Sequence, residues 1–229
     1  MTGRTRKLGH AIAAAAVALV LVTPAQAAVI SLDNLNPQHI PGVTSFITTG
    51  GTMGGMSVTA YFNGKAETAY WGSNGAISGG AAGSNWSLTL TGDSFLSSWS
   101  FVNDGAGKLT RLVIDGSSAL TVFDKKQPHF GTDESWAGLD FRSSLADDHA
   151  IAAIYRNPVG VGGAGAVGDL FHILDLDFTG LQTNGTRESF TFKQDTDNDS
   201  RFAVPEPSML ALFGLGLVGA ARARRRARA

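Results

Sequence analysis

Met56–Phe62, with the sequence MSVTAYF, decides the fold class of the central part of this chain, because apolar and polar residues alternate along it. Successive side chains of an extended strand point to opposite faces, so Met56, Val58, Ala60 and Phe62 share one face. Alternation of this kind is typical of a strand that buries one face and exposes the other. The stretch therefore predicts a half-buried β-strand.

The same alternation recurs along the chain, separated by short NG, GG, DGAG and TNG segments that favour turns. About ten candidate strands without a helical stripe predict an all-β fold, an antiparallel β-sandwich that is jelly-roll-like. The further stretches are WSLTL (86–90), FLSSWSFV (95–102), KLTRLVID (108–115), ALTVFD (119–124), HAIAAIY (149–155), DLFHILDLDF (169–178) and ESFTFKQ (188–194).

One of these stretches has a helical alternative. SSLADDHAIAAIY (143–155) is rich in alanine, the strongest helix former. Its alternation nevertheless favours a strand.

The N-terminus has the three parts of a secretory signal. Basic residues at positions 4, 6 and 7 precede the uncharged run Ala11–Val22, and small residues follow at Ala25 and Ala27. This order predicts a cleavable signal peptide, in a signal helix, at residues 1–27. The predicted cleavage-site residues are Ala25, Ala27 and Ala28.

Charge and cysteine content exclude several classes of function. The chain has a net charge of −1, but between Ala28 and Val204 there are 10 basic and 18 acidic residues, a formal charge of −8. An acidic domain repels phosphates, so nucleic acid is not an expected partner. The absence of cysteine excludes thiol catalysis, Cys-ligated zinc and iron–sulfur sites.

QDTDNDS (194–200) places Asp195, Asp197 and Asp199 at alternate positions. Calcium prefers several oxygen ligands on a flexible loop, so these carboxylates predict a calcium site. The glycine and the bidentate glutamate of a complete calcium loop are missing, and a solvated acidic turn remains the alternative. No other cofactor is expected.

Two further patterns suggest carbohydrate chemistry. Asp175 and Asp177 fall on one strand face, together with Phe171 and Ile173, and paired carboxylates can act as acid and base on glycosides. Beside turns, Trp71 and Trp136 are expected to be exposed and to suit sugar stacking, whereas Trp86 and Trp99 are expected in the core.

A glycine-rich segment contains a partial nucleotide-binding pattern. Gly163, Gly165 and Gly168 have the spacing of a dinucleotide fingerprint. That motif requires a following helix, and the strand-like DLFHILDLDF follows instead, so a flexible connection is the interpretation.

The C-terminal tail is apolar but short. Ser208–Ala221 contains 14 uncharged residues, which span ~21 Å as a helix against a hydrocarbon core of roughly 30 Å. A basic cluster follows that would stay cytoplasmic by the positive-inside rule, so the tail predicts a stop-transfer segment that holds the chain temporarily. The arginines are Arg222, Arg224, Arg225, Arg226 and Arg228.

VPEPSMLALFGLGLVGAARARRR (204–226) resembles the PEP-CTERM sorting signal of Gram-negative, exopolysaccharide-producing bacteria. The resemblance implies recognition by an exosortase, a membrane-embedded cysteine transpeptidase. The enzyme would remove the tail and release the protein or transfer it to the cell surface. The corresponding motif residues are Val204, Pro205, Glu206 and Pro207.

Together these patterns predict a signal peptide at 1–27, a β-sandwich domain at 28–200 and a sorting signal at 201–229. The expected function is a non-enzymatic surface or extracellular-matrix protein associated with exopolysaccharide, as in a biofilm. The expected partners are signal peptidase and exosortase, with the inner membrane as a transient location before the surface or matrix. The alternatives are a secreted carbohydrate-active enzyme and a purely structural matrix component.

Overall fold

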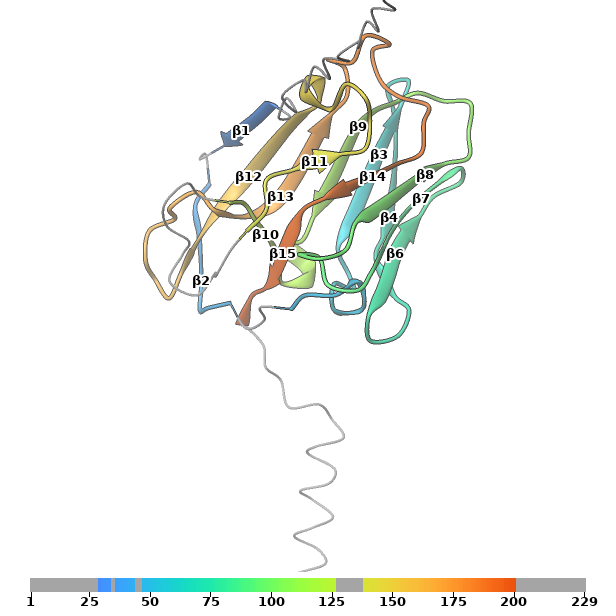
Figure 1. Ribbon diagram of the computed structural model, residues 1–229. Helices are drawn as coiled ribbons and strands as arrows, with labels where there is room; N and C mark the ends of the chain where they lie inside the picture. The colour runs from blue at the N-terminus through green and yellow to red at the C-terminus, as the bar shows by residue number, and fades with distance from the viewer. Residues whose placement is uncertain (1–28, 34–35, 44–46, 127–137, 201–229) are drawn as a thin grey trace, which may run out of the picture.

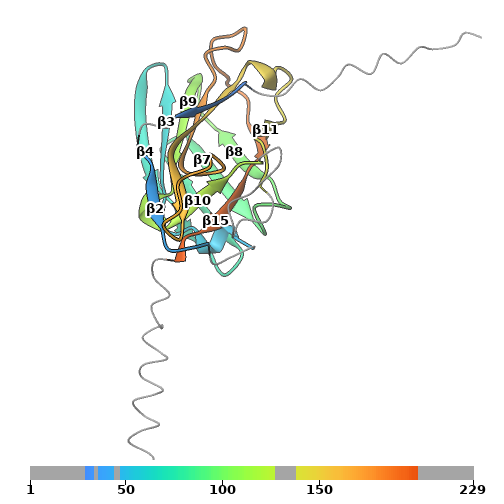
Figure 2. The ribbon, with the colours of Figure 1, turned by 90° about the vertical axis from the view of Figure 1, so that its left-hand side faces the viewer.

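The computed structural model describes residues 29–33, 36–43, 47–126 and 138–200, which form two β-sheets that face each other across a shared core (Figures 1 and 2). These residues contain fifteen strands, three short 3₁₀ turns and no α-helix. No helix in this part of the chain is long and apolar enough to span a membrane. The predicted all-β character is confirmed for these residues, whereas the predicted signal helix and C-terminal helix lie outside them.

The larger sheet has nine strands, with the order β1-β12-β13-β9-β3-β4; β10 pairs with β13 and β15, and β2 pairs with β12. Its strands are β1 (Val29–Asp33), β2 (Gln38–Ile40), β3 (Ser57–Phe62), β4 (Lys65–Tyr70), β9 (Leu109–Asp115), β10 (Thr121–Asp124), β12 (Ala152–Val161), β13 (Leu170–Asp177) and β15 (Asp195–Asn198).

The smaller sheet has six strands in the order β11-β14-β8-β7-β6-β5. Its strands are β5 (Gly72–Ser73), β6 (Ser78–Ala82), β7 (Trp86–Thr91), β8 (Trp99–Asn103), β11 (Arg142–Ser143) and β14 (Phe190–Lys193), and the 3₁₀ turns are η1 (Gly50–Thr52), η2 (Ser117–Ala119) and η3 (Asp148–Ala150).

The prediction of a fully antiparallel fold is wrong for the larger sheet, which is mixed. Both β1 and β2 pair with β12 in parallel, with Val29 opposite Ala152 and Gln38 opposite Val159. Parallel neighbours need a long crossover connection, and more than a hundred residues separate β1 from β12. Strand alternation reports which residues form strands but not their direction relative to a distant partner.

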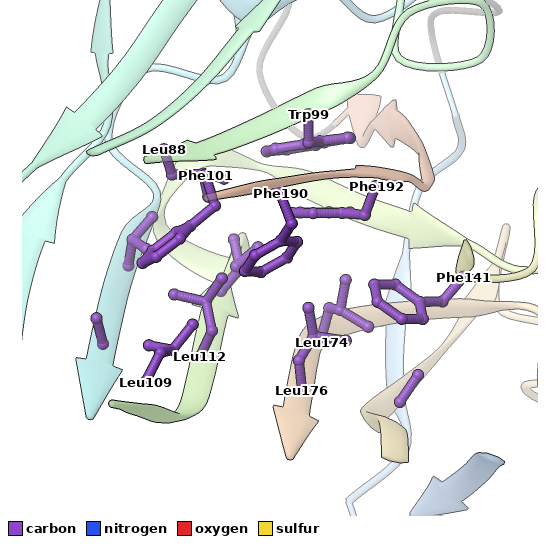
Figure 3. Close-up of a cluster of buried hydrophobic side chains, with 14 of the residues drawn as sticks. Leu88, Trp99, Phe101, Leu109, Leu112, Phe141, Leu174, Leu176, Phe190 and Phe192 are labelled. Atoms are coloured by element: carbon purple, nitrogen blue, oxygen red, sulfur yellow. The ribbon is translucent and has the colours of Figure 1, made fainter. Parts of the chain in front are cut away.

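The core lies between the two sheets and is rich in aromatic rings (Figure 3). In MSVTAYF, Met56, Val58 and Ala60 are fully buried and Phe62 packs against them, which confirms the predicted face. Trp99 of β8 stacks on Phe192 of β14 with 5.6 Å between ring centroids. Rings of this size bury 150–250 Å² each, so they supply much of the favourable free energy of folding.

The alanine-rich stretch 143–155 forms no α-helix, and its predicted strand is confirmed only from Ala152 onward. A 3₁₀ turn ends at Ala150, and β12 then begins at Ala152 and places Ala153 and Tyr155 in the core. The glycine-rich segment after Val161 leads directly into β13. Because no helix follows, the dinucleotide-binding interpretation is excluded.

Gln194 is the single residue between β14 and β15, where the chain passes from the smaller sheet to the larger one. Its side chain is fully buried. The amide Nε2 donates to the carbonyl oxygens of Asp124, Leu139 and Asp195, and Oε1 accepts from the Tyr155 hydroxyl. Its backbone oxygen accepts from the Trp99 indole at 2.9 Å. Every polar group of this buried side chain is therefore satisfied, as burial requires.

Gly79 of β6 allows an unusually close contact between segments. A Cβ atom at this position would lie 2.1 Å from the Gly50 oxygen and 2.4 Å from the Trp71 Nε1. Trp71 is 3% exposed and donates its indole hydrogen to the same Gly50 oxygen at 2.8 Å. The expectation that Trp71 is exposed is therefore wrong, because η1 covers its ring.

We expect Gly79→Ala to destabilise the protein by about 1–3 kcal/mol, because the added methyl group meets backbone atoms that cannot move independently. Gly72→Ala is the matched control, since its Cβ would meet only the Gly80 oxygen at 3.9 Å. Its effect should stay within about 0.5 kcal/mol. Urea unfolding followed by tryptophan fluorescence measures both, and equal stability of the two variants would contradict the packing described.

Candidate functional site

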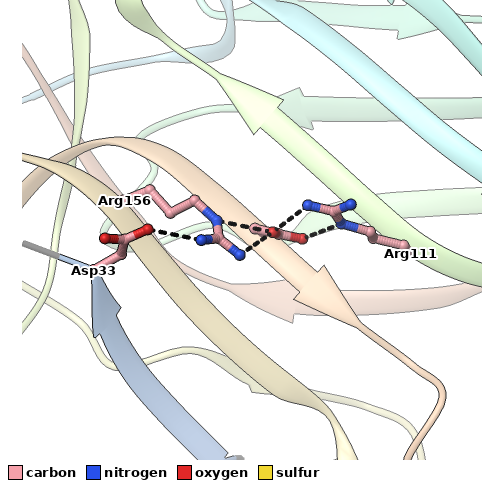
Figure 4. Close-up of polar contacts among 4 residues, drawn as sticks. Asp33, Arg111 and Arg156 are labelled. Carbon is pink, nitrogen blue, oxygen red and sulfur yellow. Dashed lines mark hydrogen bonds and ion pairs between the residues drawn. The ribbon is translucent and has the colours of Figure 1, made fainter. Parts of the chain in front are cut away.

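Asp175, one member of the predicted acid pair, is the centre of an ionic network across four strands (Figure 4). Its two carboxylate oxygens accept from Arg111 Nε and Nη2 at 2.7 and 2.6 Å. Arg156 donates to the same carboxylate from the other side at 3.0 and 3.1 Å, and also to Asp33 at 2.7 Å. The network joins β1, β12, β13 and β9 on the outer face of the larger sheet.

The burial of Asp175 makes its charge costly unless the network compensates it. Asp175 is only 1% exposed, whereas Arg111 is 42% exposed and its guanidinium group lies over the Tyr61 ring at 5.3 Å. The hydrogen bond to Asp175 raises the pKa of Arg111. A buried carboxylate without such partners would be strongly destabilising, so the two arginines are required wherever Asp175 is ionised.

The second acid of the pair has a local role. Asp177 Oδ1 accepts from the Thr179 backbone nitrogen at 2.8 Å and from its hydroxyl at 2.6 Å, which closes the turn after β13. Phe171, predicted on the same face, lies in the core instead. At the N-terminal end of β13, Phe171 pairs with β10, whereas the strand pairs with β9 from Ile173 onward. This change of partner interrupts the alternation of buried and exposed side chains. Asp175 and Asp177 thus make separate contacts, each of which stabilises the local structure.

The three predicted calcium ligands lie at the last strand, not in a loop. Asp195 and Asp197 belong to β15 and are 7% and 5% exposed, and Asp199 follows at 4%. Asp195 Oδ1 accepts from the Ser94 hydroxyl at 2.9 Å and from the Thr196 backbone nitrogen at 2.8 Å. In the described part of the chain, no group of three or more acidic or histidine side chains is arranged to hold a metal. The calcium role stays a prediction.

These carboxyl groups are perturbed by their surroundings. Burial raises the pKa of Asp197 to about 8, with further contributions from the negative charges of Asp124 and Asp195. Burial also raises the pKa of Asp195 to about 7, although the hydrogen bond from Ser94 acts to lower this pKa. Asp197 therefore carries a proton at neutral pH in the folded protein, which removes the repulsion from its neighbours.

A groove of about 420 Å³ with a mixed polar and apolar lining lies at the other end of the sandwich. It is formed by the turns between β3 and β4, β6 and β7, and β8 and β9, which gather at the upper right of Figure 1, far from the end of β15. Aromatic, amide and charged side chains line it together. They are Phe62, Asn63, Lys65, Glu67, Asn85 and Asn103, with Trp86 beneath.

Glu67 fixes the shape of this groove by joining the two sheets. Its Oε1 accepts from the Ser84 backbone nitrogen and hydroxyl at 2.8 and 2.7 Å, and Oε2 accepts from the Trp86 indole at 2.9 Å. The hydrogen bonds from Ser84 lower the pKa of Glu67. An ionised carboxylate held in this way keeps the β6–β7 turn in place against β4.

Sequence reasoning missed the groove because its asparagines have the signature of turn residues. Asn63 has a φ of 50°, the left-handed region that asparagine tolerates. Trp86 and Trp99 are buried as predicted. Trp136, the sorting residues Val204–Pro207, the arginines of the tail and the cleavage site Ala25–Ala28 lie outside the described residues.

We expect stability to fall as the pH rises from 5 to 8. The folded-state pKa of Asp197 lies above its ordinary value of 3.8, so its contribution is fully present below about pH 4 and is lost as pH rises through the folded value. Asp197→Asn, which keeps the neutral form at every pH, should raise the melting temperature at pH 8 and flatten the pH profile.

Asp104→Asn is the control, because it removes the same charge from an exposed turn. Differential scanning fluorimetry measures all three proteins, and an unchanged slope in Asp197→Asn would contradict the assignment. Repeating the titration with calcium tests the predicted metal role. Calcium bound to the ionised carboxylates should raise the melting temperature most at high pH.

The comparisons with known proteins concern the tail. No curated protein and no solved structure matches the chain. Residues 203–226 match the family model described as the PEP-CTERM protein-sorting motif. The motif implies processing by an exosortase, export and sorting to the cell surface. The chain therefore carries, three residues beyond the last described residue Ser200, the sorting signal of an exosortase-processed exported protein.

Proposed function

We propose that this chain is a non-enzymatic surface or matrix protein that binds exopolysaccharide through the groove lined by Asn63, Asn85 and Phe62. The observation that carries the proposal is the sorting motif directly after the β-sheet domain, because it sends that domain outside the cell. The groove lies at the end of the sandwich away from the end of β15. β9 runs between the two ends, and its seven residues span about 23 Å.

The chemistry of the groove supports a neutral polysaccharide as ligand. Asn63, Asn85 and Lys65 are exposed there, and the edge of Phe62 adds apolar surface. Amide and charged groups can donate to and accept from sugar hydroxyls, while a ring can contact their apolar faces. The formal charge of −8 between Ala28 and Val204 disfavours a polyanionic chain.

The first test concerns processing. We expect the protein recovered from the surface and medium of native cells to have lost both terminal signals. Its intact mass should correspond to a C-terminus near Pro205–Pro207, with or without an added group. A mass that still includes the tail through Ala229 would mean that the apolar segment is the final anchor, which would overturn exosortase release.

The second test concerns binding. We expect the full chain in detergent to be retained on immobilised exopolysaccharide from the producing cells. Asn85→Ala should weaken retention by about tenfold, the equivalent of one lost hydrogen-bonding group of ~1.4 kcal/mol. Asn74→Ala is the matched control, since it also replaces an exposed turn asparagine but lies in the β5–β6 turn.

Three other outcomes would each contradict part of the proposal. No retention of the unchanged protein would reject polysaccharide binding and favour the purely structural alternative. Retention that is equal for Asn85→Ala and the unchanged protein would place the binding surface elsewhere. Release of reducing ends from the polysaccharide would instead favour the enzyme alternative.

A further inference from the structure

Large apolar side chains are exposed at the end of the sandwich where β15 finishes. Leu96 is 71% exposed, Ile47 64%, Ile77 57% and Phe95 37%. They come from three different segments: the stretch before η1, the β5–β6 turn and the β7–β8 loop. We call these four residues the apolar tip.

Backbone hydrogen bonds hold the three segments together. The Ser94 nitrogen donates to the Thr48 oxygen at 2.8 Å, and the Gly92 nitrogen donates to the Ile77 oxygen at 2.8 Å. A β-bridge between Thr49 and Asp93 lies between these two contacts. The three segments that carry the apolar tip are therefore neighbours in the fold.

The same segments hold the last strand of the domain. Ser94 donates its hydroxyl to Asp195 at 2.9 Å, and the Thr196 hydroxyl contacts Met53 Sδ at 3.6 Å. At the end of the described chain, the Ser200 nitrogen donates to the Gly42 oxygen at 2.8 Å. Figure 1 shows these loops and the end of β15 together at the lower end of the molecule.

The length of chain beyond Ser200 limits how far this end can lie from the membrane. The apolar run of the sorting motif begins at Ser208, eight residues after Ser200. Eight fully extended residues span at most ~27 Å. While the apolar run is in the bilayer, Ser200 therefore lies within ~27 Å of the lipid surface, and the end of the sandwich that carries the apolar tip is the nearer one.

We propose that the apolar tip contacts the lipid interface of the membrane that holds the sorting tail. Four apolar side chains bind a bilayer only weakly by themselves, because stable attachment requires a second signal. The tail supplies that signal, since tethering raises the effective concentration of the tip at the lipid surface. After the tail is removed, the contact is released.

The absence of cysteine makes a direct test simple. Leu96→Cys in the full chain, labelled with an environment-sensitive fluorophore, is reconstituted into liposomes of phosphatidylethanolamine and phosphatidylglycerol. Nitroxide-labelled lipids should quench this label several-fold more than the same label on Asn85→Cys at the groove. Equal quenching at the two positions would overturn the proposal. A doubled mass in detergent, with no quenching in liposomes, would assign the tip to a second copy of this chain and would also overturn it.

A second experiment avoids an apolar label. The combined variant Ile47→Ser, Ile77→Ser and Leu96→Ser should slow removal of the tail in native cells by several-fold. Val29→Ser is the control, because Val29 is also 57% exposed but lies at the opposite end of the sandwich. Melting temperatures of both variants establish that they fold. An unchanged rate of tail removal, with folding intact, contradicts a role for the tip. Neither result depends on polysaccharide retention, which tests the proposed function separately.

Discussion

The hydrogen bonds of Gln194 are the constraint on which the two-sheet arrangement depends. At Gln194 the chain passes from the smaller sheet to the larger one with its side chain in the core, where unpaired donors and acceptors are costly. Gln194 makes this crossing in one residue and pairs all of its amide atoms with β10, β12 and the segment before β11. Trp99 then packs over the crossing and bonds to its backbone oxygen. The chain has no cysteine, so this polar junction and the aromatic rings around it hold the two sheets together without the disulfides that stabilise many exported domains.

Much of the fold was predictable because burial leaves a local signature. MSVTAYF and the residues of β12 both show alternating apolar and polar side chains, and both form strands. What could not be predicted depends on distant partners. The parallel pairing of β1 with β12, the cover that η1 provides for Trp71, and the arginines on Asp175 each join segments that local sequence does not connect. The role of the aspartates in β15 was equally unpredictable, because their alternate spacing fits a loop as well as a buried edge strand.

The two ends of the sandwich differ in chemistry as well as position. Turns at one end present asparagines, a lysine and an aromatic ring around a groove. Loops at the other end present Ile47, Ile77 and Leu96 next to the strand that leads into the sorting motif. The sheets between them are rigid because each strand is hydrogen-bonded to its neighbours and the core is close-packed. Ser200, the last described residue before the sorting motif, lies at the end that carries the apolar loops.

The directions of β1 and β12 have a consequence for the order of maturation. Val29 lies beside the start of β12, whereas Ser200 bonds to Gly42, near the end of that strand. The ten residues of β12 separate the two positions by about 33 Å. In a precursor inserted through both its predicted leader and its sorting tail, the two attachment points would therefore lie at opposite ends of β12. The order of the two cleavages therefore decides which end of the domain stays attached to the membrane.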